Sequence, residues 1–219
     1  MSVFRLDEDD ISFPHPTLAE PDGLLAVGGD LSVERLLTAY SNGIFPWFSP
    51  GDEILWWCPK ERFIIRPEKI HISHSMKKYI RKHDCGILLD QDFSGTMHRC
   101  RQVHEAADST WISDEMEEAY ARLHKEGFAL SVEAVIDDEL AGGLYGVLIG
   151  NCFFGESMFS LRPNGSKIAL ILLSELLAEN DFLMIDCQFH TEHLESMGGE
   201  RISWEEYEEL LSRNPCIRQ

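Results

Sequence analysis

The sequence predicts an α+β fold in two parts, a small mainly helical N-terminal domain over residues 1–127 and a second domain over residues 128–219. Before Gly127, capped amphipathic segments alternate with loops rich in proline, glycine and aromatic residues, a pattern typical of helices joined by turns. After Gly127 the sequence changes to short apolar segments typical of strands, interrupted by one long apolar helix. This change of period sets the predicted boundary.

The first predicted helix spans residues 32–42. Asp30 or Ser32 can cap its N-terminus, and Gly43 can end it in the left-handed conformation. The segment 43–59 then places three tryptophans and two phenylalanines among turn residues, so neither helical nor strand periodicity persists. The aromatic side chains of such a loop either pack in a hydrophobic core or line a pocket.

Three more helices are predicted before the boundary. Two of them lie near residues 92–107 and 113–126, and the second begins with a Ser-Asp-Glu cap. The other, over residues 73–83, starts at a serine and carries four basic side chains on one broad side: Lys77, Lys78, Arg81 and Lys82. This basic side is either a solvated face or a contact for phosphate groups.

The second domain is predicted to contain three consecutive strands, a buried helix and a fourth strand. Their ranges are 128–136, 140–150, 151–160, 166–180 and 182–190. In an extended fourth strand, Asp186 and Gln188 share one face, while Ile185, Cys187 and Phe189 face the other way. Two polar groups therefore stand side by side in an apolar run.

The composition limits the classes of protein to consider. Hydrophobic residues make up 44% of the 219, which allows a sizeable core, and no apolar stretch approaches the length of a membrane span. The net charge of −19 argues against general nucleic-acid binding and favours a cationic partner. The six cysteines form no CxxC pair, as expected of reduced thiols, so we expect a cytoplasmic protein. No further ligands complete the histidine pairs 71/74 and 190/193 into a zinc site, so we expect no bound metal.

A candidate site follows from three polar residues in the third and fourth predicted strands. If the strand before Glu156 neighbours the one that carries Asp186 and Gln188, the three side chains converge on an opening lined by apolar residues. An apolar pocket with a few placed polar groups is the usual form of a small-ligand site. A satisfied hydrogen-bond network between buried strands explains the same residues equally well.

Five blocks of the sequence, in order, are similar to those of a known family. The run GLLAVGGDLSVERLLTAYSNGIFPWFSPGDEILWW, followed by STWIS, GGLYGV, GESMFS and IDCQ, resembles the bacterial leucyl/phenylalanyl-tRNA-protein transferases. The resemblance extends from Phe13 to about Trp204. It implies a C-terminal domain similar to the GNAT acyltransferases. It also implies transfer of Leu or Phe, and less readily Met, from aminoacyl-tRNA to the α-amine of proteins that begin with Arg or Lys. That reaction marks the proteins for degradation, and it needs no cofactor.

The resemblance also assigns catalytic roles. Gln188 is expected to contact the attacking amine, Asp186 to polarise or orient it, and Glu156 to hold the amino or ribose end of the substrate. An unmodified amide is a very poor base, so Gln188 acts as an orienting acceptor. The tRNA ester is already activated and an α-amine has a pKa of about 7.7 to 8.0, so positioning can supply most of the acceleration.

Further positions match the substrate-binding residues of the family. Trp47 and Trp111 correspond to aromatic residues near the terminal adenosine, where a flat ring can stack on the base. The basic helix is expected to contact the tRNA, and the chain to act as a monomer. The aminoacyl side chain is expected to lie among Leu144, Phe153, Met158, Leu173 and Ile185.

The sequence departs from the family at several positions, and two other functions stay open. Cys58 to Arg62 replace a common Ser-Pro-x-Pro-Arg stretch, Gly165 stands where Ala is usual, and Leu173 where Phe is common, which affects the ranking of donors. One alternative is an acetyl-CoA-dependent N-acetyltransferase, although Lys167 ends the loop where Gly or Ala approaches the pyrophosphate. The other is a non-catalytic adaptor for cationic N-termini.

Overall fold

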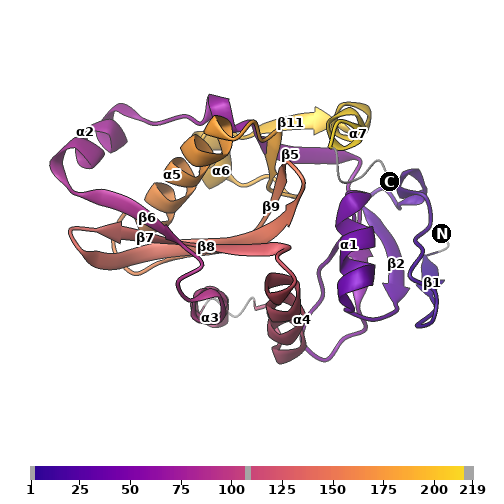
Figure 1. The fold of residues 1–219 in the computed structure, drawn as a ribbon. Helices are drawn as coiled ribbons and strands as arrows, with labels where there is room; N and C mark the ends of the chain where they lie inside the picture. Colours follow the sequence, from indigo (N-terminus) through magenta and orange to yellow (C-terminus); the bar gives the residue numbers. More distant parts are fainter. Residues whose placement is uncertain (1–2, 107–109, 215–219) are drawn as a thin grey trace.

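The computed structural model describes residues 3–106 and 110–214 and arranges them around two β-sheets (Figure 1). The larger sheet has the strand order β11-β5-β10-β9-β8-β7-β6, and the smaller has the order β1-β2-β4-β3. The mixture of helices and mostly antiparallel sheets is compatible with the predicted α+β class. The strands are β1 (Phe4–Leu6), β2 (Leu24–Gly28), β3 (Phe45–Pro46), β4 (Leu55–Trp57), β5 (Glu61–Ile65), β6 (Cys85–Leu89), β7 (Ala129–Ile136), β8 (Glu139–Ile149), β9 (Cys152–Ser160), β10 (Met184–Asp186) and β11 (Glu200–Ser203).

Helices cover both faces of the larger sheet. The α-helices are α1 (Val33–Ser41), α2 (His74–Lys82), α3 (Phe93–Glu105), α4 (Asp114–Lys125), α5 (Gly165–Glu179), α6 (Glu192–Ser196) and α7 (Trp204–Ser212), with short 3₁₀ turns at Pro16–Leu18 and Pro67–Lys69. Helix α5 lies on one face, and α3 and α4 lie on the opposite face (Figure 1). One apolar core fills the space between α5 and the sheet, and a second joins the other face to the smaller sheet. The central strands of the sheet are therefore buried on both sides.

The predicted helices are confirmed, together with their capping residues. Ser32 caps α1, and Gly43 follows the helix with a φ of +70°. Ser73 and Ser113 cap α2 and α4, and Gly127 follows α4 with a φ of +82°. Residue 107, the predicted end of the third helix, lies outside the described residues.

The mainly helical character predicted for residues 1–127 is not confirmed. This part contains β1 to β6, four of them in a sheet of their own. Strands β5 and β6 belong to the larger sheet, so that sheet takes strands from both sides of residue 127. These six strands are not evident from the sequence because each is only two to five residues long, too short for a clear periodicity to develop.

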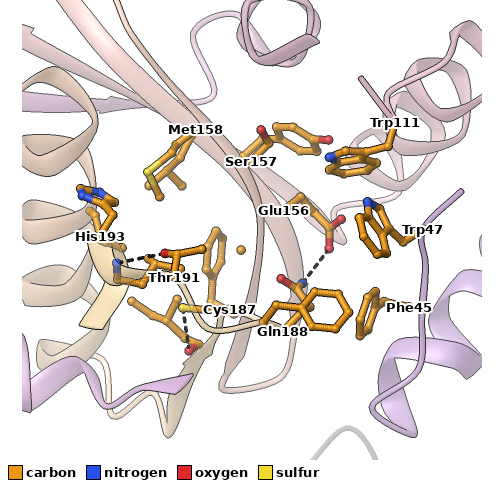
Figure 2. Close-up of a pocket in the computed structure, with 18 of the residues that line it drawn as sticks. Phe45, Trp47, Trp111, Glu156, Ser157, Met158, Cys187, Gln188, Thr191 and His193 are labelled. Carbon is orange, nitrogen blue, oxygen red and sulfur yellow. Dashed lines mark hydrogen bonds between the residues drawn. The ribbon is translucent and has the colours of Figure 1, made fainter. Parts of the chain in front are cut away.

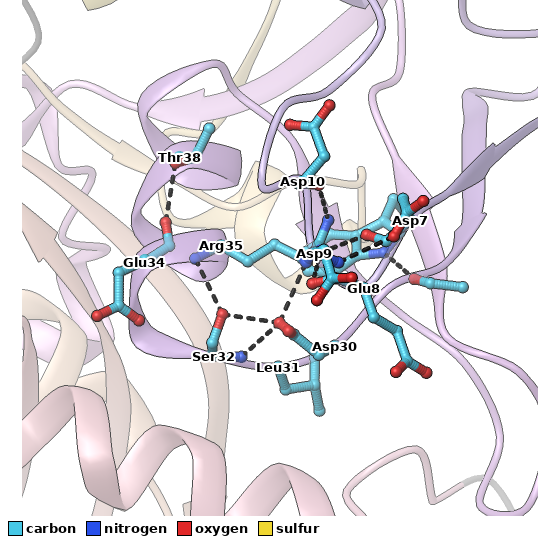
Figure 3. Close-up of polar contacts among 12 residues, drawn as sticks. Asp7, Glu8, Asp9, Asp10, Asp30, Leu31, Ser32, Glu34, Arg35 and Thr38 are labelled. Atoms are coloured by element: carbon cyan, nitrogen blue, oxygen red, sulfur yellow. Dashed lines mark hydrogen bonds and ion pairs between the residues drawn. The ribbon is translucent and has the colours of Figure 1, made fainter.

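A buried arginine on α1 fixes the acidic N-terminal segment (Figure 3). Arg35 is fully buried; its Nε donates to Asp30 Oδ1 at 3.1 Å. Its two terminal nitrogens donate to the backbone carbonyls of Asp7, Glu8 and Asp10. Because Arg35 binds carbonyls here, the carboxylates of residues 7–10 stay exposed and contribute to the acidic surface.

A β-bulge in the pairing of β8 with β9 brings Glu156 to the sheet face that carries the site. Tyr145 pairs with Ser157, but the next residue, Gly146, pairs with Gly155, so Glu156 is an extra residue without a partner in β8. A bulge of this kind bends the strand and re-aims a side chain. As a result, side chains here do not alternate between buried and exposed positions, and residues 155–158 are all half-buried.

Two features concern the described residues as a whole. Among residues 3–106 and 110–214, no helix is both long and apolar enough to cross a membrane. The cysteines at 58, 85, 100, 152 and 187 are free thiols, while Cys216 lies outside the described residues.

We predict that Gly146→Ala destabilises the protein, because the bulge leaves no room for a side chain there. A Cβ atom at Gly146 would lie 2.2 Å from the carbonyl oxygen of Phe154 and 2.5 Å from the ring of Phe153. Overpacking of this kind costs about 1 to 3 kcal/mol of unfolding free energy, measurable by urea denaturation. Gly86→Ala on β6 is the control, because its Cβ meets no atom within 4 Å. Equal effects of the two substitutions would contradict the prediction.

Candidate active site

A largely apolar cavity of about 450 Å³ lies where β8, β9, β10 and α6 meet the aromatic segment around β3 (Figure 2). Strands β9 and β10 run parallel, with Phe153 beside Ile185 and Phe154 beside Asp186. Glu156 and Gln188 each follow two residues after the last of these pairs, so the register brings them together at the end of β10. The cavity therefore has a polar edge where the two chains separate.

Glu156 is held at this edge by hydrogen bonds from three side chains. Tyr40 donates to Oε1 at 2.7 Å, Tyr120 donates to Oε2 at 3.3 Å, and Gln188 Nε2 donates to Oε1 at 3.3 Å. The hydroxyls of Tyr40 and Tyr120 also bond to each other. Burial raises the pKa of Glu156 to about 7, although both tyrosine hydroxyls act to lower it. Close to neutral pH, Glu156 can therefore carry or release a proton.

Gln188 reaches the cavity through a tight turn and not as part of a strand. The predicted strand 182–190 is wrong in extent, because β10 ends at Asp186 and Gln188 has a φ of +57°. A left-handed conformation costs a non-glycine residue about 1 to 3 kcal/mol and persists only where its surroundings impose it. Here the N–H of Gln188 donates to Asp186 Oδ1 at 2.9 Å, and the N–H of Phe189 donates to the carbonyl of Cys187.

Asp186 lies behind the cavity wall and is not among the described residues that line it. Its side chain is fully buried and forms an ion pair with Arg62 of β5, at 2.6 Å between Nη2 and Oδ2 and 3.1 Å between Nε and Oδ1. Tyr207 of α7 donates to Oδ2 at 2.6 Å. Burial acts to lower the pKa of Arg62, but the charge and hydrogen bonds of Asp186 together with the neighbouring Tyr207 raise it. Asp186 and Gln188 are therefore joined through the backbone and do not stand side by side.

Most of the residues expected around the aminoacyl side chain line the cavity. Leu144, Phe153, Met158 and Ile185 are among its lining residues, but Leu173 is not. Leu173 is fully buried in the core around α5, and Leu170, one turn earlier, reaches the cavity in its place. The sequence predicts the helix correctly but not which of its sides faces the cavity.

Trp47 and Trp111 both lie on the cavity wall near Glu156 (Figure 2). Trp47 is 43% exposed and packs against Trp57 and Phe189, with ring centroids 5.7 and 5.4 Å apart. The ring of Trp111 lies 6.3 Å from that of His104. Two large flat rings therefore flank the polar edge of the cavity.

The basic residues of α2 lie apart from this cavity. Helix α2 occupies the end of the molecule next to β6, far from the smaller sheet (Figure 1). All four basic side chains on it are exposed, and none lines the cavity: Lys77, Lys78, Arg81 and Lys82.

Several residues of the site were not singled out from the sequence. Tyr40 and Tyr120 come from α1 and α4, and only the tertiary fold brings them to Glu156. His104 of α3 lies 2.9 Å from the Ser157 hydroxyl, and burial lowers the pKa of this histidine. Arg62 was noted only within a departure from the family pattern; the signal available was one arginine in the apolar run ERFII. Among the described residues, no group of three or more potential ligands could hold a metal ion.

Comparisons with known proteins identify the family. The family model described as leucyl/phenylalanyl-tRNA protein transferase matches residues 64–212, and the model of its N-terminal domain matches residues 29–60. A transferase of this name from Desulfatibacillum aliphaticivorans is 54% identical over 91% of this chain and 86% of its own length. The one from Anaeromyxobacter sp. (strain Fw109-5) is 50% identical over 100% of this chain and 94% of its own.

Among solved structures, the chain is similar to L-PGS from Bacillus licheniformis, with 10% identity and a TM-score of 0.47 over 90% of this chain and 72% of that one. A likeness this low supports no conclusion. The sequence comparisons make the protein an aminoacyltransferase, which uses aminoacyl-tRNA as donor and a protein as acceptor. The chain belongs to the leucyl/phenylalanyl-tRNA-protein transferase family.

We predict that Glu156 makes stability depend on pH. The pKa of Glu156 is about 7 in the folded protein against an ordinary value of 4.5, so between these values the folded state binds the extra proton. The stability that Glu156 contributes is fully present below pH 4.5 and is lost as the pH rises through 7. Urea denaturation at pH 5 and pH 8 measures the effect, with Glu156→Gln as the variant that cannot titrate.

The compared quantity is the free energy of unfolding of the natural protein minus that of Glu156→Gln. This difference is expected to be larger at pH 5 than at pH 8. A difference that stays constant, or that grows as the pH rises, would show that Glu156 does not titrate in this range.

Proposed function

We propose that the protein transfers Leu or Phe, and less readily Met, from aminoacyl-tRNA to the α-amine of proteins that begin with Arg or Lys. The observation that carries this proposal is an apolar cavity that ends at one carboxyl and one amide group. A side chain such as Leu or Phe gains free energy by entering such a space, and its ester then lies at the polar edge. Transfer to such N-termini marks proteins for degradation.

The cavity supports the choice of donor. Leu144, Phe153, Met158 and Ile185 surround the space, and Leu170 contributes from α5. We assign these residues to the aminoacyl side chain and leave Leu173 out, because it packs in the core. Unbranched or γ-branched side chains fit this space, and β-branched ones fit poorly.

Gln188 is the proposed contact of the attacking amine. Its amide nitrogen donates to Glu156, which leaves the amide oxygen as an acceptor for an N–H of the amine. Asp186 is then a positioning residue, because it holds the backbone of Gln188 and its own oxygens are occupied by Arg62 and Tyr207. This replaces the expectation that Asp186 acts on the amine itself.

Glu156 is proposed to hold the amino or ribose end of the donor. Proton release from the attacking amine needs an acceptor whose pKa lies near the working pH, and the pKa of Glu156 is about 7. Water or a hydroxyl of the substrate can serve the same purpose. The reaction asks little more of the protein, since positioning an amine next to an activated ester supplies most of the acceleration.

The donor's nucleic acid is assigned to two other regions. Trp47 and Trp111 are proposed to stack on the terminal adenosine, and the exposed basic side of α2 is proposed to contact the tRNA. The net charge of −19 attracts an Arg or Lys N-terminus, which carries two positive charges while its amine is protonated. The basic side of α2 thus suits the tRNA, and the negative charge of the protein as a whole suits the cationic N-terminus of the acceptor.

We further propose that the C-terminal part is GNAT-like and that the protein is a monomer. The antiparallel order β7, β8, β9, followed by α5 and by β10 parallel to β9, supports the GNAT-like topology. Because the donor belongs to the aminoacyl-tRNA pool used in translation, the cytoplasm is the proposed compartment.

Incubation with charged tRNA and a peptide tests the proposed substrates. Leu-tRNA, Phe-tRNA, Met-tRNA and Ile-tRNA are each combined with peptides that differ only in an N-terminal Arg, Lys or Ala, and mass spectrometry detects the added residue. We expect addition of Leu and Phe to the Arg and Lys peptides, less addition of Met, and little of Ile.

Gln188→Ala is expected to reduce the rate about 100-fold or more, because orientation of the amine is lost. The control is Gln102→Ala, an exposed glutamine of α3 that should leave the rate unchanged. Equal addition to the Ala peptide, or a Gln188→Ala variant with the natural rate, would contradict the proposal.

A further inference from the structure

A second cavity of about 460 Å³ lies beside the first, on the other side of α6. His193 and Leu194 line the first cavity, whereas Ser196 and Met197 line the second. The remaining walls of the second cavity come from α2 and from the start of α5. The short helix α6 therefore separates two cavities of similar size but different chemistry.

The described lining of the second cavity mixes polar residues with Met76, Tyr79 and Met197, and it contains no carboxylate. Lys167 and His71 are its basic residues, and Ser73, Ser75, Ser196 and Asn164 supply hydroxyl and amide groups. Although the chain has 38 acidic and 19 basic residues, the charge at this cavity comes from a lysine, which attracts anions. Hydroxyl groups and an ammonium group are also the donors that bind phosphate oxygens.

Lys167 is the charged group of this cavity. It is half-buried, and within residues 3–106 and 110–214 it forms no ion pair. Its charge reaches His193 of α6, since the pKa of His193 is lowered first by burial and then by Lys167. A half-buried ammonium group on the wall of a cavity can form charge-assisted hydrogen bonds with an anionic ligand.

The surroundings of the cavity fit a polynucleotide. Helix α2 contributes Ser75, Met76 and Tyr79 to the cavity wall and carries its four basic residues on exposed positions. A positive field therefore extends from Lys167 over the outer side of α2. A nucleic acid whose 3′ end enters the first cavity can pass its backbone across α6 to this field.

We propose that the second cavity binds a backbone phosphate of the aminoacyl-tRNA donor, with Lys167 as the charged contact and one hydroxyl of the hydrogen-bonded Ser73–Ser75 pair as an additional donor. This inference rests on the proposed function, in which the aminoacyl end of the donor occupies the first cavity. It adds a site that holds the body of the tRNA and takes no part in the transfer step. Lys167 thus contributes to donor affinity and not to the chemical step.

Two donors distinguish this site from the first cavity. Leu-tRNA carries backbone phosphates, whereas 3′-O-leucyl-adenosine carries none. We expect Lys167→Gln to raise the KM for Leu-tRNA about five- to tenfold, as for a lost charged contact, and to leave the KM for leucyl-adenosine and both kcat values unchanged. The magnitude of the slope of log Kd against log salt for uncharged tRNA should fall by about 1.

Three controls complete the experiment. Lys167→Arg keeps the charge and should keep the natural KM, and Lys125→Gln removes an exposed charge from α4, on the other face of the sheet, without effect on either donor. A thermal-shift titration with inorganic phosphate against chloride of equal ionic strength should stabilise the natural protein more than Lys167→Gln. This titration tests the site even if a variant is poorly active.

Each other result overturns the inference. An unchanged KM for Leu-tRNA, or an equal rise for both donors, would show that Lys167 does not contact the tRNA backbone. Stabilisation by phosphate together with an unchanged KM would assign the cavity to free phosphate. Absence of transfer from either donor by the natural protein would contradict the proposed function, which is a different failure.

Discussion

The buried ion pair between Arg62 and Asp186 is the interaction on which the site depends. It joins β5 to β10, and Tyr207 of α7 completes it from a third element. The other terminal nitrogen of Arg62 donates to the carbonyl of Gly43, which fixes the end of α1 next to the aromatic segment. Removal of one partner from a buried pair costs about 3 to 5 kcal/mol, so these elements are held together strongly. Oδ1 of Asp186, which also accepts from Arg62 Nε, holds the turn that presents Gln188.

Two local irregularities then bring the polar groups to an otherwise apolar cavity. The bulge in β9 places Glu156 on the cavity side, and the left-handed turn after β10 does the same for Gln188. The hydroxyls of Tyr40 and Tyr120 satisfy Glu156 from the N-terminal part of the chain. An apolar surrounding strengthens each of these polar contacts, because little water competes for them. The site is thus built from several parts of the chain and is rigid at its polar edge.

Local signals in the sequence predicted most of the helices and the strands after Gly127. Serine caps and following glycines act within a few residues, so α1 and α4 could be placed closely. The short strands before Gly127 could not, because their formation depends on pairing with distant strands. Asp186 illustrates the same limit: its alternation with Gln188 was correct for a strand, but the ion pair with Arg62, 124 positions away, was not visible. Because α5 is apolar on most sides, its sequence does not show that Leu170 faces the cavity and Leu173 the core.

A double-mutant cycle on Asp186 and Gln188 tests the account most directly. The kcat of the transfer reaction is measured for Asp186→Asn, Gln188→Ala and the double variant, each per mole of folded protein. If Asp186 acts only by holding Gln188, the double variant has the kcat of Gln188→Ala alone. If the two losses multiply, Asp186 acts on the reacting groups independently, and the central role assigned to the Arg62–Asp186 pair in positioning Gln188 is wrong.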